Sequence, residues 1–345
     1  MDNIVDVIRT IATTREIPED VLFESIQAAL VTAFKKNFGS NRVARIEFDR
    51  ETGEIQVYSR YRVVEKVIQP ENEISLEDAK EIDVMYELDD VVERRESPED
   101  FGRISAMAAK QVVVQRIREA ERSSIYEEFK ARENELIYAQ IQRISNRVVY
   151  FNLGKAEATL PPKEQIPGER YRVGARFRCY IAQVKEETKA PEIVLSRTHP
   201  GLIRRLFELE IPEINDGEVL IRSIAREAGS RTKISVFSRS EDLDPVGACV
   251  GPKGTRVASI VDELGGEKID IVEYTDDDAQ YIVNALSPAK VTRVDFLTEK
   301  NVRVVVPDYQ LSLAIGKEGQ NARLAAKLTG FKIDIVSESA LEEEE

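Results

Sequence analysis

Two short glycine loops carry the residues with the clearest potential for chemistry. The first reads Gly-Pro-Lys-Gly over residues 251–254, and the second reads Gly-Lys-Glu-Gly over residues 316–319. Glycines permit a tight turn and leave no side chain that would keep another backbone at a distance. A helix that begins after such a turn offers free N–H groups and the positive end of its dipole to phosphate. Each loop also holds a lysine, so the pattern favours a clamp for a nucleic-acid backbone.

The two loops lie in an internal repeat. A helical run follows each loop, and the pentapeptide Lys-Ile-Asp-Ile-Val then occurs at 268–272 and again at 332–336. The loops are 65 residues apart and the pentapeptides 64. Such a register indicates one duplicated module. Gly-x-x-Gly between two helices is the arrangement with which KH modules clamp about four nucleotides.

Two other interpretations of the loops are weaker. A single Gly-x-x-Gly is most often a helix–turn–helix with glycine caps, but two hits in register, each before the same strand, argue against this. A P-loop needs Ser or Thr after its Gly-Lys pair and a glycine upstream. Glu318 and Leu311 occupy those positions in the second loop. In the first loop Lys253 follows proline, so the Gly-Lys pair is missing.

The elements that position the loops follow from periodicity. In each copy a strand (234–237 or 302–306) precedes an apolar helical segment, the loop, a second helix and the pentapeptide strand. Val257, Ile260, Val261 and Leu264 form an apolar stripe on the second helix of the first copy. Leu324, Ala325 and Leu328 form a less complete stripe in the second copy. We predict that Gly251→Asp combined with Gly316→Asp weakens RNA binding while the fold survives.

Short β-rich runs separated by turn residues precede the repeat. They lie at 136–144, 147–153, 156–160, 176–184 and 193–195. Five such runs in about 65 residues predict a small antiparallel barrel. Barrels of this kind bind single strands by stacking bases on exposed aromatic rings above a basic groove. Tyr150 is the candidate ring, or else only a half-buried strand residue, with Arg147 and Lys163 nearby. Arg172, Arg176 and Arg178 are further basic candidates for the groove.

The first 130 residues or so form a separate unit. Apolar residues at helical spacing predict a helix around residues 22–33, and alternating runs at 44–48 and 55–61 predict a hairpin. A long helix is expected over 104–130. Between these elements, residues 71–100 hold thirteen acidic against three basic side chains. This run is either a solvated face or a docking surface for a basic partner.

Composition excludes several classes of protein. The 345 residues are 42 % hydrophobic, with no apolar run long enough for a membrane span and no secretory signal at the N-terminus. Two cysteines and one histidine exclude a disulfide scaffold and any multi-histidine metal site. His199 and Cys249 are interpreted as packing residues and Asp276–Asp278 as a charged turn, so we expect no catalytic residue, metal or cofactor. The net charge of −14 argues against non-specific nucleic-acid binding by the chain as a whole, although residues 131–200 carry twelve basic against eight acidic side chains.

Several longer runs are specific enough to indicate a family. They are Asp244-Pro-Val-Gly-Ala-Cys-Val-Gly-Pro-Lys-Gly-Thr-Arg256, Glu263-Leu-Gly-Gly-Glu-Lys-Ile-Asp-Ile-Val272, Ala314-Ile-Gly-Lys-Glu-Gly-Gln-Asn-Ala-Arg-Leu-Ala326 and Ala109-Lys-Gln-Val-Val-Val-Gln-Arg-Ile-Arg-Glu-Ala-Glu-Arg122. Together with the order of modules, they make nearly the whole chain resemble the NusA family of bacterial transcription elongation and termination factors. Some members continue beyond the second KH module with acidic helical repeats.

The resemblance implies a multidomain α+β fold. An N-terminal RNA polymerase-binding domain with a long connecting helix (1–130) precedes a five-stranded S1-type OB barrel (131–199) and two tandem type II KH domains (200–287 and 288–345). It also implies a monomeric cytoplasmic factor, not an enzyme and without a membrane partner. Such a factor docks on RNA polymerase core, holds nascent single-stranded RNA on a continuous surface, and modulates pausing, intrinsic termination and antitermination together with other elongation factors.

The residues expected to serve this function are carried by the loops, the barrel and the N-terminal helices. RNA contacts are predicted for Gly251, Pro252, Lys253, Gly254, Arg256, Gly316, Lys317, Glu318, Gly319, Gln320, Asn321, Arg323, Tyr150, Arg147 and Lys163, and contacts to an RNA hairpin for Lys35, Lys36 and Arg103. Two alternatives stay open at this point. One is an RNA-binding factor of ribosome maturation or RNA decay, and the other is an RNA-processing enzyme with carboxylates at 276–278.

Overall fold

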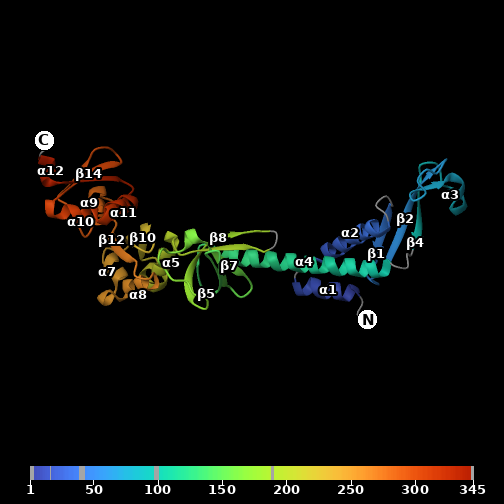
Figure 1. Ribbon diagram of the computed structural model, residues 1–345, viewed down its shortest axis with the longest axis horizontal. Coiled ribbons are helices and arrows are strands. Elements are labelled where there is room, and N and C mark those ends of the chain that lie inside the picture. Colours follow the sequence, from blue (N-terminus) through green and yellow to red (C-terminus); the bar gives the residue numbers. More distant parts are fainter. Residues whose placement is uncertain (1–3, 16, 39–42, 97–100, 188–189, 343–345) are drawn as a thin grey trace. The chain divides into compact units, whose positions relative to one another are not determined.

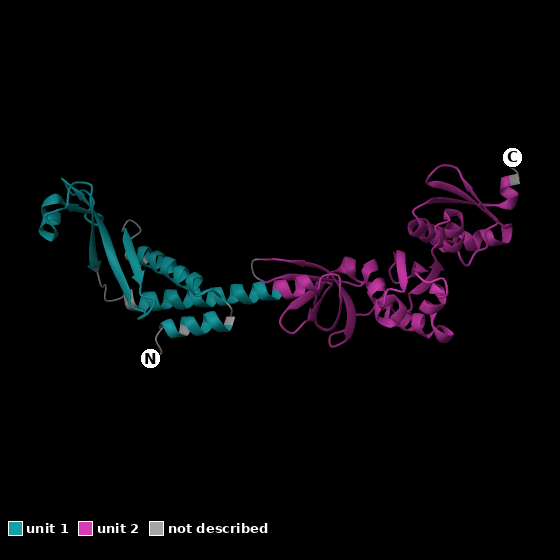
Figure 2. Cartoon of the chain, turned by 180° about the vertical axis from the view of Figure 1, so that it is seen from behind, with its two compact units in different colours: residues 1–125 teal, residues 126–345 magenta. Residues whose placement is uncertain are grey.

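The computed structural model describes residues 4–15, 17–38, 43–96, 101–187 and 190–342. The chain divides into two compact units, Met1–Ile125 and Tyr126–Glu345 (Figure 2). Each unit has apolar clusters of its own. The finer boundaries expected near residues 130, 199 and 287 stay predictions. None of the helices in the described part of the chain is long and apolar enough to cross a membrane.

The N-terminal unit contains the helices and the hairpin that the periodicity predicts, with further elements between them. Its elements are α1 (Ile4–Arg15), α2 (Glu19–Phe38), β1 (Ala44–Phe48), β2 (Ile55–Val64), β3 (Glu73–Ser75), α3 (Leu76–Ile82), β4 (Val91–Glu96) and α4 (Phe101–Ala131), the last of which continues into the second unit (Figure 1). β1 and β2 pair in antiparallel register, which confirms the hairpin. The acidic run, for which no elements were predicted, supplies β3, α3 and β4.

Two apolar clusters hold the N-terminal unit together. The larger one joins α1, α2 and α4 to the hairpin and includes Leu22, Ile26, Phe34 and Ile46, each at most 1 % exposed. The smaller one lies where β2, β3, α3 and β4 meet, around Val63 and Val92. The acidic run is therefore folded around a core of its own, because Ile74 and Ala79 from within it are buried.

The predicted barrel is present and closed. Its strands are β5 (Leu136–Ser145), β6 (Val148–Asn152), β7 (Glu157–Leu160), β8 (Arg176–Lys185) and β9 (Glu192–Ser196), in the order β5-β6-β7-β9-β8. The prediction that all pairs are antiparallel is wrong, because β7 and β9 run parallel. The reason is topological, since a ring of five strands cannot alternate direction at every contact.

Two copies of one αββααβ arrangement follow the barrel. The first comprises α5 (Pro200–Glu210), α6 (Pro212–Asn215), β10 (Val219–Glu227), β11 (Arg231–Ser238), α7 (Pro245–Val250), η2 (Pro252–Gly254), α8 (Thr255–Glu263) and β12 (Lys268–Glu273). The second comprises α9 (Asp278–Ala285), β13 (Arg293–Phe296), β14 (Asn301–Val306), η3 (Asp308–Gln310), α10 (Leu311–Ile315), η4 (Lys317–Gly319), α11 (Gln320–Thr329) and β15 (Lys332–Ser337), with α12 (Glu338–Glu342) after it. In both sheets the middle strand pairs antiparallel on one side and parallel with the pentapeptide strand on the other.

The apolar stripes of the two second helices differ from the expectation. Leu324, Ala325 and Leu328 in α11 are all at most 4 % exposed. In α8 only Ile260 is buried, as is Leu264 directly after the helix, whereas Val257 and Val261 are half-buried. The second copy therefore has the more complete stripe, opposite to what the sequence suggested, because α11 also packs against α9 and against β10 of the first copy.

The apolar clusters of the second unit cross from one module to the next. One cluster joins Ile166 and Tyr180 of the barrel to Leu202 and Phe207 of α5. A second joins Ala225 and Val272 of the first KH copy to Tyr281 of α9, at the start of the second copy, and to Leu324 of α11. The barrel and the two KH copies are thus packed on one another rather than joined only by linkers.

Candidate nucleic-acid interface

The two glycine loops have the same backbone conformation. The first glycine has φ 73° and ψ 174° at Gly251 and φ 76° and ψ 171° at Gly316. The third residue is left-handed in both, with φ 54° at Lys253 and φ 56° at Glu318. The last glycine, Gly254 or Gly319, is left-handed as well. The duplication seen in the sequence is therefore a duplication of loop geometry.

The first glycine of each loop has a packing reason as well as a conformational one. Its φ and ψ values lie in a region that is essentially restricted to glycine. A Cβ atom on Gly251 would lie 2.6 Å from Cγ of Arg256, and one on Gly316 would lie 2.8 Å from the backbone N of Asn321. The expectation that aspartates at both positions leave the fold intact is thus wrong, because each would be strained and would collide with the following helix.

Arg256 and Asn321 occupy equivalent positions and do equivalent structural work. The Arg256 guanidinium donates to the carbonyl of Ala248 at 2.6 Å and to Glu213 at 2.9 Å. The Asn321 side-chain amide, only 4 % exposed as a residue, donates to the carbonyls of Leu286 and Ala314 at 3.0 Å each. Both side chains tie the second helix to the end of the helix before the loop, and the two Arg256 bonds both come from Nη1.

Gln320 and Arg323 connect the two KH copies. The Gln320 side chain donates to Glu227 and to Ser230, both at 2.8 Å. Arg323 pairs with the same Glu227 at 2.6 Å, and the guanidinium holds the pKa of that carboxylate below its ordinary value. These two residues, predicted to contact RNA, hold the start of α11 against the edge strand of the first copy.

The remaining loop residues are exposed and available. Pro252, Lys253, Lys317 and Glu318 are all exposed. Neither α8 nor α11 has a side-chain hydrogen bond at its N-cap, which in both is a left-handed glycine. The first N–H of each helix, at Thr255 or Gln320, donates to the loop carbonyl of Pro252 or Lys317. The positive end of each helix dipole faces its loop without a side-chain cap, which favours an anion there.

Tyr150 on the barrel is half-buried and already has a stacking partner. Its neighbours Val149 and Phe151 are at most 1 % exposed, so Tyr150 faces outward as the alternation predicts. The Arg143 guanidinium lies over its ring, 3.4 Å from the centroid, and donates to both oxygens of Glu157. A base could stack on this ring only where Arg143 leaves room.

The other predicted contacts on the barrel and the helices are exposed. Arg147 sits in the tight turn between β5 and β6, where it and Asn146 are both left-handed, as two-residue hairpin turns require. Gln165 donates to the carbonyl of Arg147 at 2.6 Å and so fastens this turn to the segment that carries Lys163. In the N-terminal unit, Lys35 and Lys36 lie in the last turn of α2, and Arg103 in the first turn of α4.

Sequence reasoning missed an exposed ring at Tyr138. This residue is 61 % exposed on β5, between the buried Ala139 and the half-buried Ile137, with the Arg178 guanidinium 5.5 Å from its centroid. The alternation that singled out Tyr150 applies equally to the run at 136–144 and would have found it. Arg178, which was considered as a free basic residue, instead pairs with Glu263 of α8 at 2.7 Å.

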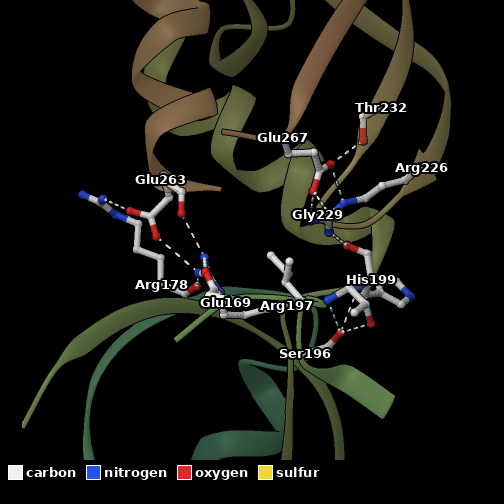
Figure 3. A network of polar contacts seen from close by, with 12 residues as sticks. Glu169, Arg178, Ser196, Arg197, His199, Arg226, Gly229, Thr232, Glu263 and Glu267 are labelled. Atoms are coloured by element: carbon white, nitrogen blue, oxygen red, sulfur yellow. Dashed lines mark hydrogen bonds and ion pairs between the residues drawn. The ribbon is translucent and has the colours of Figure 1, made fainter. Parts of the chain in front are cut away.

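A buried ion network joins the barrel to the first KH copy (Figure 3). Arg197 is 0 % exposed and lies one residue beyond β9. It donates two bonds to Glu169, at 2.6 and 2.7 Å, and others to the backbone carbonyl and the side chain of Glu263. Burial alone would lower the pKa of Arg197, but the pairing with Glu169 outweighs it and raises the pKa above its ordinary value.

A second buried network lies inside the first KH copy (Figure 3). Glu267, fully buried, accepts from Arg226 at 2.9 Å through each oxygen and from the hydroxyl of Thr232 at 2.6 Å. Burial opposes its ionisation, yet Arg226 keeps the pKa of Glu267 below the ordinary value. Because charged residues are expected outside, no pattern in the sequence pointed to these buried pairs.

The residues interpreted above as non-catalytic are buried in the core or cap helices. Cys249 is fully buried, and burial raises the pKa of its thiol to about 12. His199 caps α5, and its ring stacks on Tyr180 with centroids 4.7 Å apart. Asp277 caps α9. Within the described residues no group of three or more His, Cys, Asp or Glu could hold a metal ion.

A closed five-stranded barrel followed by two modules with matching Gly-x-x-Gly loops defines a tandem KH protein. Comparison with known proteins agrees. Residues 3–123 match the NusA N-terminal domain, residues 197–274 the NusA-like first KH domain, and residues 278–343 the NusA-like second KH domain.

Named relatives extend the similarity over nearly the whole chain. The transcription termination/antitermination protein NusA of Halalkalibacterium halodurans is 55 % identical over 98 % of this chain and 89 % of its own length. The Bacillus subtilis protein of the same name is 52 % identical over 97 % of this chain and 91 % of its own. The solution structure of the N-terminal domain of NusA from B. subtilis is 44 % identical, with a TM-score of 0.31, and covers 34 % of this chain and 95 % of that one. The chain belongs to the NusA family.

Proposed function

We propose that this chain is an RNA-binding transcription factor rather than an enzyme. In this proposal the N-terminal unit docks on RNA polymerase core, and the barrel and both KH modules hold nascent single-stranded RNA. The factor modulates pausing, intrinsic termination and antitermination in the bacterial cytoplasm, as a monomer and alongside other elongation factors. The relatives support this proposal: they are named transcription termination/antitermination protein, and their similarity extends over nearly the whole chain.

One observation carries the RNA-binding part of the proposal. Two loops with matching φ and ψ values each present a lysine and a helix N-terminus that has no side-chain cap. A phosphodiester backbone supplies the negative charge that such a helix end attracts, and the glycines let it approach. The direct contacts we propose are therefore Pro252, Lys253, Gly254, Lys317 and Gly319, with Glu318 beside them. Gly251, Gly316, Arg256, Asn321, Gln320 and Arg323 shape and fix these loops.

A charge reversal in both loops tests the clamp. We expect Lys253→Asp with Lys317→Asp to weaken binding of a single-stranded RNA 20-mer by full-length protein, measured by fluorescence anisotropy. The dependence of log affinity on log salt should become shallower by about 0.7 for each phosphate that the protein no longer neutralises. Arg170→Asp with Lys290→Asp, at two exposed basic residues outside both loops, makes the same change in charge and is the matched control. Equal affinity of the control and the folded double variant would exclude the clamp.

Association with polymerase is tested separately. The full chain should sediment with purified bacterial RNA polymerase core through a glycerol gradient, before and after ribonuclease treatment. Association that disappears with ribonuclease would mean that RNA alone connects the two. Sedimentation with ribosomal particles and not with polymerase would transfer the proposal to ribosome maturation or RNA decay.

A further inference from the structure

A cavity with basic walls lies where the barrel meets the first KH copy. Its volume is 480 Å³, and β8, α5 and β10 contribute to its lining. Three arginines line it, Arg204, Arg205 and Arg222, together with His199 and Tyr180. None of the described residues that line it is Asp or Glu. In a chain with a net charge of −14, a cavity with this lining is suited to an anion.

Two of the three arginines, Arg204 and Arg222, have no carboxylate partner among the described residues. Arg205 is paired with Glu208 at 2.6 Å and also donates to the backbone carbonyl of Asn134. Arg204 donates only a long bond, 3.4 Å, to the carbonyl of Ile221. The Arg222 guanidinium lies over the ring of Tyr274, 5.2 Å from its centroid, and Arg222 also lines a neighbouring cavity with Tyr274 and the carboxylates of Glu241, Glu273 and Asp276. Among the described residues no carboxylate lies within ion-pair distance of Arg204 or Arg222, and both are exposed.

The local fold places Arg204 and Arg222 at the lining of the cavity. β10 and β11 shift register between Ile221 and Ser223, so Arg222 is the extra residue of a β-bulge. Bulges redirect a side chain out of the regular alternation and are frequent beside functional sites. Arg204 belongs to the first turns of α5, where Leu202 and Ile203 are buried and Arg204 faces solvent.

An aromatic pair completes the lining. His199 stacks on Tyr180 with an interplanar angle of 8° and is nevertheless exposed. Its Nδ1 accepts from the N–H of Gly201 at 3.0 Å, which leaves Nε2 as the donor of the neutral ring. Planar guanidinium groups for phosphate, next to an N–H donor and an aromatic ring, are the groups that recognise a nucleotide.

We propose that this cavity binds a nucleotide phosphate of the RNA chain as the RNA crosses from the barrel to the first KH module. Arg204 and Arg222 hold the phosphate, and His199 contacts the adjoining sugar or base. The inference rests on the proposed function, since it adds a contact to the same RNA path. Free nucleotides carry the same phosphate chemistry, so the experiment compares RNA with ATP and with inorganic phosphate.

The chain supplies its own probe. His199 is the only histidine in the sequence, so the imidazole signals in an NMR spectrum of the full-length protein need no assignment. We expect an RNA 20-mer to shift these signals at concentrations that saturate the anisotropy signal. ATP and inorganic phosphate at equal phosphate concentration should shift them much less, because the KH loops anchor only the RNA.

Charge-neutral variants complete the test. Arg204→Gln with Arg222→Gln should abolish the RNA-dependent shift of His199 and lower RNA affinity about 3- to 10-fold, with a salt slope shallower by about 0.7. Arg204→Lys with Arg222→Lys should keep most of the affinity, and an unchanged melting temperature verifies folding of both. Arg170→Gln with Lys290→Gln, at two exposed basic residues outside the cavity, removes the same charge and should leave the shift intact.

The possible outcomes distinguish the cavity from the proposed function. A wild-type protein that binds no RNA contradicts the proposed function itself. RNA binding with unmoved His199 signals, and with equal affinities for the cavity variant and its control, overturns only the cavity. A shift with ATP at least as large as that with RNA would assign the cavity to a free nucleotide and overturn the proposed RNA contact.

Discussion

The two KH copies share one loop backbone and differ in the side chains that the loops expose and in how each copy is fastened. Their loop φ and ψ values agree within a few degrees. The exposed residues between the glycines are Pro252 and Lys253 in the first copy and Lys317 and Glu318 in the second. Duplication has therefore preserved the shape of the clamp while its charge has diverged, and the first copy has the more basic loop.

The copies also differ in how they are fastened. The first copy is joined to the barrel by Arg197, whose side chain is 0 % exposed. The second copy is joined to the first through Arg323 and Glu227, whose side chains are 46 % and 23 % exposed. A buried ion pair left without one partner is costly, whereas an exposed pair contributes little. An ion pair therefore contributes more to stability between the barrel and the first KH copy than between the two KH copies.

The largest effect is expected at the buried joint. Arg197→Met leaves the Glu169 carboxylate without its cation and the backbone carbonyl of Glu263 without this donor, so it should lower the free energy of unfolding by about 3–5 kcal/mol. Arg323→Met, the counterpart at the exposed joint, should cost less than about 1 kcal/mol. Urea unfolding followed by circular dichroism measures both. Equal losses would mean that burial does not distinguish the two joints.

The next effect concerns the first glycine of each loop. Gly316→Ala should destabilise by about 3 kcal/mol, since alanine is strained at these dihedral angles and its Cβ meets the immobile backbone of Asn321. Gly251→Ala should cost a similar amount, because its Cβ would meet Cγ, Cδ and Cβ of Arg256, the near part of a side chain that is hydrogen-bonded to Ala248 and Glu213. Gly254→Ala, with open space around the added Cβ, should cost about 1 kcal/mol. A loss at Gly254 as large as that at Gly316 would contradict the packing explanation.

The aspartate of the repeated pentapeptide sharpens the comparison further. Asp270 accepts from Arg231 at 2.6 Å and from the buried Lys233 at 3.1 Å, whereas Asp334 is 65 % exposed and 3.9 Å from Arg303. Burial disfavours the charged form of Asp270, but the hydrogen bonds of Arg231 and the charge of Lys233 outweigh it and lower the pKa. Asp270→Asn should cost about 2 kcal/mol at pH 7, and Asp334→Asn less than about 0.5 kcal/mol.

The pH dependence of the stability difference between wild type and Asp270→Asn provides the control for this prediction. A carboxylate with a lowered folded pKa stabilises the protein fully above its unfolded pKa, near the ordinary value of 3.8. That contribution disappears as the pH falls through the folded pKa. The difference in stability between wild type and Asp270→Asn should therefore be constant between about pH 5 and about pH 7, and shrink below about pH 4. A difference that grows toward acid pH would show the opposite shift.

The smallest effects are expected from the loop charges themselves. Lys253→Asp alone should weaken RNA binding more than Lys317→Asp alone, because Glu318 already offsets the second loop. Glu318→Lys should strengthen binding about 2- to 5-fold and steepen the salt slope by about 0.7, if the added lysine meets one phosphate. Anisotropy titrations over a range of salt concentrations measure these changes. No response to Glu318→Lys would mean that the second loop does not approach RNA.

Local patterns were enough to predict many of the elements, although not α1 or the β3, α3 and β4 of the acidic run. Separation along the chain explains most of the side-chain contacts that were missed. The hairpin, the barrel strands and the strand–helix–loop–helix–strand order all follow from alternation, helical spacing and glycine. Arg323 and Gln320 meet a glutamate more than ninety positions away, and Arg178 meets one 85 positions away. No spacing rule within one copy reveals such partners, so these side chains were predicted to face RNA.

Buried charged residues were the second feature that sequence patterns did not predict. Arg197, Lys233 and Glu267 are fully buried, although their residue types are normally exposed. Each is compensated by a partner on another element, a condition that only the folded chain displays. Within the loops, by contrast, the sequence already distinguishes a bare lysine from a lysine beside a glutamate. The shape and charge of the clamp were thus predictable, whereas the side chains that hold it in place were not.

The shared apolar cluster between the KH copies has a consequence for the nucleic acid. Ala225 and Val272 of the first copy lie in one cluster with Tyr281 and Leu324 of the second, and the Tyr281 hydroxyl donates to Ser235 at 2.9 Å. The two proposed clamps belong to modules that share one apolar cluster, so the fold sets the distance between the two glycine loops. An RNA gripped by both must present its two contact segments at a fixed interval. Extra nucleotides between them must then loop out.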